Sequence, residues 1–175
     1  PFGRLLDPFG GFWANAEPAD RTFADESLTL DGLQAPVAVR FDTLGVPHVF
    51  AQNDHDLYFA QGYLTARDRL WQMEFQTHAA AGRLSEIVGE KALELDRYKR
   101  RLGMVYAAEQ ALKGMAADPT AKGVVEAYSD GVNAYISSLK PGDLPLEYKL
   151  LGYAPEAWSP LKCALLLKEM TFTLA

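Results

Sequence analysis

The sequence predicts an α+β fold that is mostly helical and contains one β-hairpin. Residues 36–42 and 46–51 place β-branched or aromatic residues at alternate positions, on either side of a turn at 43–45. From residue 54 onward, apolar residues recur at spacings of three, four and seven, which is the pattern of helices with one buried face. These two patterns predict a hairpin followed by a series of helices.

Composition and charge exclude several classes of function. Of 175 residues, 17 are Lys or Arg and 23 are Asp or Glu, so the net charge is −6. Binding to nucleic acid through phosphates needs a local surplus of cations, and the densest basic run is only 98–101. Uncharged stretches such as 57–66 are far shorter than the roughly 20 apolar residues that cross a bilayer. We therefore expect no nucleic-acid partner and no membrane span.

The chain is expected to comprise an extended N-terminal arm, 1–31, and one domain, 32–175. Prolines and glycines interrupt the arm, while Phe9 and Trp13 are among its large apolar residues. So much exposed aromatic surface would be a liability in solution, so we expect the arm to lie across another surface, such as a second chain. A mobile arm is the alternative.

The hairpin and the first helix follow from local signals. Pro47 has no N–H to donate, so the second strand is expected at the edge of its sheet. Asn53 offers an N-cap for a long helix over about 54–88. Gly62 and Gly82 weaken that helix and are expected to bend or break it.

The later helices have clear boundaries in the sequence. A helix is expected over about 91–115, with a break at Gly103. A cap residue followed by proline begins one helix at 118–119 and the last helix at 159–160. The last helix has no glycine or cationic cap after its apolar pattern, so we expect the chain to be part of a larger protein.

Few residues have the spacing of a catalytic or metal site. The three histidines lack the spacing of metal ligands, no nucleophile-elbow motif is present, and the single cysteine excludes an internal disulfide. Cys163 has two interpretations, a reactive thiol at a helix start or a small buried residue, and its apolar neighbours favour burial. The charged stretch 67–69, with Gln72, Glu74 and Gln76, has an acid/base site as one interpretation, but a structural ion-pair network is favoured.

Several distinctive motifs follow one another along the chain. They are Val39-Arg40-Phe41-Asp42, Gly45-Val46-Pro47-His48-Val49-Phe50-Ala51, Asp68-Arg69-Leu70-Trp71-Gln72-Met73-Glu74, Gly82-Arg83-Leu84-Ser85-Glu86, Tyr128-Ser129-Asp130-Gly131-Val132-Asn133-Ala134-Tyr135 and Leu151-Gly152-Tyr153-Ala154-Pro155-Glu156-Ala157-Trp158-Ser159-Pro160. In this order, the motifs resemble the N-terminal part of the α chain of the penicillin acylase family, a branch of the N-terminal-nucleophile hydrolases. The resemblance covers roughly 140 residues, far more than a short motif gives by chance.

The resemblance implies an amidohydrolase made as a zymogen, a precursor that cleaves itself into an α and a β chain. Together the two chains would form a heterodimer with an αββα sandwich. The nucleophile would be the serine that begins the β chain, with its own α-amine as base. This chain would then hold no catalytic residue and would be inert alone. The substrate would be an amide with an apolar acyl group, such as the antibiotic penicillin G or an N-acyl homoserine lactone.

The resemblance also implies what this chain contributes to the enzyme. The last helix would supply part of the acyl pocket through Met170 and Leu174, or, in an ungapped match, through Thr171 and Ala175. Calcium is expected in the whole enzyme, with ligands mostly outside this chain. A periplasmic or otherwise exported location is expected. The alternative hypothesis is a helical binding or assembly module without a catalytic partner.

Overall fold

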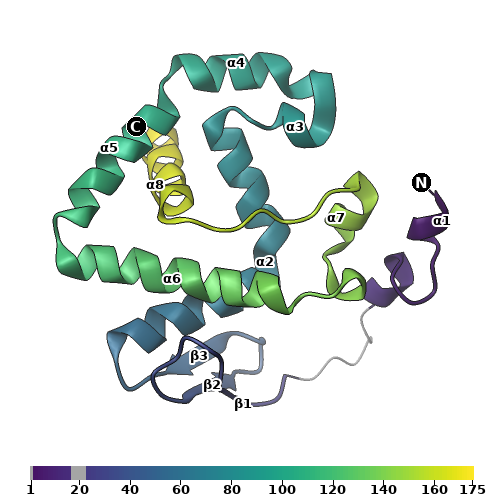
Figure 1. Ribbon diagram of the computed structural model, residues 1–175, viewed down its shortest axis with the longest axis vertical. Coiled ribbons are helices and arrows are strands. Elements are labelled where there is room, and N and C mark those ends of the chain that lie inside the picture. Colours follow the sequence, from purple (N-terminus) through teal and green to yellow (C-terminus); the bar gives the residue numbers. More distant parts are fainter. Residues whose placement is uncertain (1, 17–22) are drawn as a thin grey trace.

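The computed structural model describes residues 2–16 and 23–175, and shows a small sheet at one end of a group of helices (Figure 1). No helix among the described residues is both long and apolar enough to span a membrane. The helices are α1 (Phe2–Leu5), α2 (Asp54–Ala81), α3 (Ser85–Val88), α4 (Leu93–Arg101), α5 (Met104–Ala116), α6 (Pro119–Ser138), α7 (Leu146–Leu151) and α8 (Pro160–Leu174). The strands are β1 (Glu26–Leu28), β2 (Val37–Phe41) and β3 (Pro47–Phe50), and 3-10 turns lie at η1 (Phe12–Asn15), η2 (Gly89–Ala92) and η3 (Pro141–Asp143).

The sheet is antiparallel in the order β1-β2-β3. Residue Phe41 pairs with Pro47, which confirms both the hairpin and the edge position of the second strand. Strand β1 lies inside the 1–31 stretch, for which no regular element was expected, and pairs with β2 from Glu26 to Leu28. Three residues are too short for alternation to be recognised in the sequence. The 1–31 arm and the 32–175 domain remain a prediction, and residues 17–22 lie outside the described part.

Helix α2 runs through the centre of the fold and follows the predicted helix 54–88 as far as Ala81. The break expected at Gly82 is confirmed, because Gly82 takes a left-handed conformation with φ 65° and ends the helix. It does not break at Gly62, and its non-helical residue is Arg69, with φ −143°. The predicted break at Gly103 is confirmed, with φ 69° between α4 and α5.

The other helices largely follow their predicted starts. The Asp118 carboxylate accepts a hydrogen bond from Thr120 N at 2.9 Å, so α6 begins as expected. Helix α8 begins at Pro160, although the Ser159 side chain makes no capping bond. The short helix α7 was not predicted, because its six residues lie between breakers.

Asp56, in the first turn of α2, joins the helix to the segment before the sheet. Its buried carboxylate accepts hydrogen bonds from Gln34 N and Ala35 N, both at 2.9 Å. Burial alone would raise the pKa of Asp56, but the bonds from Gln34, His55, Asn53 and Ala35 outweigh it and lower the pKa from 3.8 to about 2.

Replacing Asp56 by asparagine is expected to cost about 1–3 kcal/mol of stability at neutral pH, because the buried side chain then has one acceptor oxygen for two part-buried backbone N–H groups. The folded pKa is depressed, so the carboxylate stabilises the wild type above the unfolded pKa of 3.8, and this stabilisation is lost as the pH falls towards about 2. The melting temperatures of the wild type and of Asp56→Asn should therefore differ at pH 7 and approach each other as the pH is lowered. The exposed first-turn residue Asp54 provides the control Asp54→Asn, which should show no such convergence.

Candidate functional site

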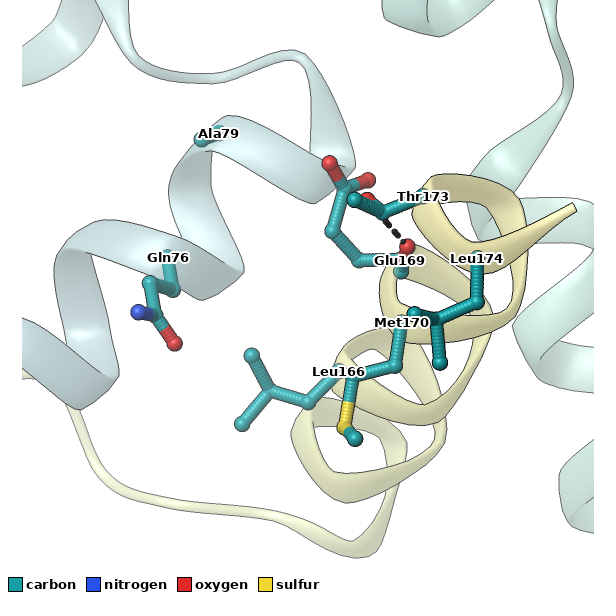
Figure 2. A pocket seen from close by; sticks show the side chains of 7 residues that line it. All are labelled: Gln76, Ala79, Leu166, Glu169, Met170, Thr173 and Leu174. Atoms are coloured by element: carbon teal, nitrogen blue, oxygen red, sulfur yellow. Dashed lines mark hydrogen bonds between the residues drawn. The ribbon is translucent and has the colours of Figure 1, made fainter.

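A groove of about 390 Å³ lies between the C-terminal half of α2 and the end of α8 (Figure 2). Helix α2 contributes Gln76 and Ala79. Helix α8 contributes Leu166, Glu169, Met170, Thr173 and Leu174. The groove therefore combines an apolar wall on α8 with polar side chains from both helices.

The apolar wall arises from the helical repeat. Leu166, Met170 and Leu174 follow one another at steps of four residues, which places them on the same side of α8. The side chain of Leu166 extends towards Gln76, while Met170 and Leu174 continue the same wall (Figure 2). Met170 is 60% exposed and Leu174 82% exposed, so the wall is accessible to a ligand. Its shape and chemistry suit an apolar chain.

Two alternative pairs of residues on α8 were expected to line the acyl pocket, and one of the two pairs lines the groove. Met170 and Leu174 line the groove, but Thr171 and Ala175 are not among its lining residues. Thr171 instead donates from Oγ1 to Leu167 O within the helix at 2.8 Å. Contact of Met170 or Leu174 with a substrate remains a prediction. The sequence placed Gln76 in the polar stretch that begins at Arg67, but not in a groove with α8, because no local spacing relates it to that helix.

The charged stretch near residue 67 is part of an ion-pair network, as favoured from the sequence. Arg67 Nη1 lies 2.6 Å from Glu26 Oε1 and so joins α2 to β1. Arg69 Nη1 donates to Gln72 Oε1 at 3.1 Å. Asp68 is 44% exposed and lies, with Arg69, beside a second groove of about 610 Å³ between β3 and α2.

A partly buried polar cluster lies further along α2, and the sequence indicated Glu74 but not its two partners. Ligand atoms of Glu74, His78 and Glu156 lie within 4.8 Å of one another. Cations already neutralise this cluster: Arg83 Nη2 is 2.7 Å from Glu156 Oε1, and Lys162 Nζ is 3.4 Å from Glu156 Oε2. The hydrogen bond from Arg83 is the main reason why the pKa of Glu156 falls from 4.5 to about 2. The cluster is therefore a structural network that needs no metal.

Cys163 fits the interpretation favoured from its neighbours. The residue is partly buried, and Trp158 Nε1 donates to its Sγ at 3.3 Å. Burial raises the pKa of the Cys163 thiol. A thiol with a raised pKa is a poor nucleophile at neutral pH, so Cys163 acts as a small packing residue.

The helices, the small sheet and the open apolar groove define a mostly helical segment of an α+β protein. The chain belongs to the penicillin amidase family, whose model matches residues 36–175. It is 44% identical over 134 residues to penicillin acylase 2 proenzyme of Pseudomonas sp. strain SE83, and 39% identical over 176 residues to the acyl-homoserine lactone acylase QuiP of Pseudomonas aeruginosa. These matches cover 77% and 99% of this chain but only 17% and 20% of the relatives.

A solved structure shows the same fold. A thermostable penicillin G acylase from Alcaligenes faecalis matches with a TM-score of 0.69 and 28% identity, covering 79% of this chain and 75% of that chain. Family and fold thus confirm the resemblance found in the sequence. The relatives are amidohydrolases, and the name proenzyme marks one of them as a precursor.

Proposed function

We propose that this chain is the α-chain part of an amidohydrolase that cleaves the amide between an apolar acyl group and an amine. The observation that carries the proposal is the apolar wall of Leu166, Met170 and Leu174 along an open groove. The two named classes of relative suggest the substrates, which are a β-lactam such as penicillin G or an N-acyl homoserine lactone.

In this proposal, this chain binds the substrate and the β chain carries out the chemical reaction. The α8 wall holds the acyl group by burying its apolar surface and excludes water from that side of the groove. The hydroxyl oxygen of the N-terminal serine of a β chain, freed by autocatalytic cleavage, attacks the amide carbonyl carbon, and the serine's own α-amine takes the hydroxyl proton. That proton passes to the amine as the C–N bond breaks, and water then hydrolyses the acyl-serine ester to release the acid and restore the serine. No catalytic residue is assigned to this chain. We further propose that the heterodimer is exported, to the periplasm where the cell has one.

Calcium is proposed only for the whole enzyme. Calcium takes six to eight oxygen ligands, including carboxylates that are free to bind it. Among the described residues, the cluster of Glu74, His78 and Glu156 does not fit: its carboxylates already contact Lys162 and Arg83, and an imidazole is not an oxygen ligand. No step of the proposed function depends on the metal.

The test is to express the full-length precursor that contains this segment and to assay two substrates. Release of phenylacetate from penicillin G, or of fatty acid from N-acyl homoserine lactones, together with a new N-terminal serine on a β chain, would support the proposal. A precursor that stays uncleaved and inactive towards both amides would instead favour a helical binding or assembly module.

Replacing Met170 by alanine is expected to change acyl-chain preference without affecting autocatalytic cleavage. Shortening one wall of an apolar pocket alters discrimination by about tenfold or more per methylene of the ligand. The measurement is kcat/KM over a series of acyl lengths. The control is Thr171→Ala, on the same helix but outside the groove. If Thr171→Ala shifts the preference and Met170→Ala does not, the ungapped match is the correct one.

A further inference from the structure

The helix α4 is fixed to the α2 side of the groove described above. Arg100 Nε donates to Gly82 O at 2.7 Å, directly after the last residue of α2. The buried Asp96 carboxylate accepts from Leu84 N at 2.8 Å and from Ser85 N at 2.7 Å. These three backbone groups lie between the end of α2 and the start of α3, so α4 is joined to the segment that directly follows the helix carrying Gln76.

The same helix also contacts the α8 side of the groove, through Lys99. This lysine is only 8% exposed, and its Nζ lies 2.5 Å from Glu169 Oε1. The Nζ also lies 4.9 Å from the centre of the Phe172 ring, within cation–π range. A buried lysine needs such partners, so both contacts hold the ammonium group in place.

These contacts act on the half of α8 that has the least packing. Ala164 and Leu165 are buried and anchor the first half of the helix, whereas Met170 and all residues after it are exposed. Among the described residues, Lys99 provides the ion pair and the cation–π contact that join residues 166–174 to another helix.

Helix geometry relates Lys99 to the groove. Glu169 lines the groove next to Met170. Phe172 is not among the lining residues, but it lies three residues from Glu169 and therefore on the same side of α8 as Glu169. At a radius of about 5 Å, a rotation of α8 by about 20° would move a side-chain tip by about 2 Å. A displacement of this size is enough to alter the fit of a ligand.

We propose that Lys99 is a positioning residue that connects α4 to α8, and so sets the width of the acyl groove and the acyl length it accepts. The acyl substrate in this proposal comes from the proposed function, whereas the connection between α4 and α8 does not depend on that function. Figure 1 shows α4 running between the α3 end of the fold and α5, above α2 and α8.

The experiment compares Lys99→Met, Lys99→Arg and Arg97→Met in the full-length enzyme. Arg97 is the matched control, because it lies on α4 and pairs with the exposed Glu94 of the same helix. With N-acyl homoserine lactones of increasing acyl length, Lys99→Met should change the ratio of kcat/KM between long and short chains by about tenfold. The change should appear mainly in KM, Lys99→Arg should restore the wild-type ratio, and Arg97→Met should match the wild type.

A second measurement does not depend on activity. Hydrogen exchange of the backbone amides of 169–174 should accelerate in Lys99→Met and stay unchanged in Arg97→Met. If Lys99→Met does not fold, Glu169→Gln weakens the same ion pair while keeping the side-chain shape, and the same two readouts apply. Unchanged exchange, or a parallel loss of activity for every acyl length, would overturn the proposal. An enzyme inactive towards all amides would contradict the proposed function, while faster exchange would still support the connection.

Discussion

Replacing Gly131 by alanine is expected to destabilise the protein by about 3 kcal/mol or more, because α6 and α2 cross with no room for a methyl group. A Cβ at Gly131 would lie 1.9 Å from Phe59 O, and one at Gly62 would lie 2.1 Å from Tyr128 O. Both obstacles are backbone carbonyls, which cannot rotate away as a side chain can. The two helices would have to separate, and the core around Val132, which is fully buried, would open with them.

The measurement is the apparent melting temperature of the full-length protein, with soluble yield as a second readout. Gly123→Ala is a matched control, because Gly123 lies in the same helix and a Cβ there meets nothing within 4 Å. Alanine should raise stability at Gly123 by about 0.5–1 kcal/mol, since it favours the helix over the unfolded chain. The two substitutions should thus have opposite signs. A neutral result at Gly131 would show that the helices are not so closely packed.

Gly62 also illustrates a contact that could not be predicted from the sequence. Within one helix, glycine indicates weakness, and a break near Gly62 was predicted for that reason. The actual role of Gly62 depends on Tyr128, which is 66 positions away in the sequence and carries no local mark of the contact. Hairpin, caps and helix starts are local features, so they were predictable. The close crossing of α2 and α6 was not predictable, because it depends on residues that are far apart in the sequence.

In the candidate site, too, local patterns could be predicted from the sequence and contacts between helices could not. The steps of four from Leu166 to Leu174 are visible in the sequence, but the choice of Met170 and Leu174 came from the family resemblance rather than from spacing. The opposite wall at Gln76 is brought there by the packing of α2 on α8. Lys99 and Glu169 likewise come from separate helices, and neither belongs to a motif that would have paired them.

Glu74 is the second position where a single substitution should have a large effect. Its side chain is buried, and its two oxygens accept from Tyr148 OH and, at 2.8 Å, from Glu156 N. The Nζ of Lys162, at the start of α8, lies 4.0 Å from the same carboxylate. One side chain of α2 therefore joins α7, the loop before α8, and α8 itself.

Replacing Glu74 by alanine is expected to cost about 3–5 kcal/mol, because the buried partners lose their acceptor and the buried ammonium of Lys162 loses a counter-charge. Glu74→Gln should cost less, since an amide oxygen can still accept one of the two hydrogen bonds. Glu126→Ala is the control: its pair with Lys122 is exposed and 3.8 Å apart, so its effect should stay within about 0.5 kcal/mol.

A double-mutant cycle with Tyr148→Phe separates the hydrogen bond from general packing. Burial and the neighbouring Glu74 carboxylate both raise the pKa of Tyr148, so its hydroxyl stays protonated and donates. If the pair is directly coupled, the loss in the double variant should fall short of the sum of the single losses by about 1–3 kcal/mol. Additive losses would mean that Glu74 stabilises the fold without this hydrogen bond. In that case the contribution of Glu74 would come from its contacts with Glu156 N and Lys162.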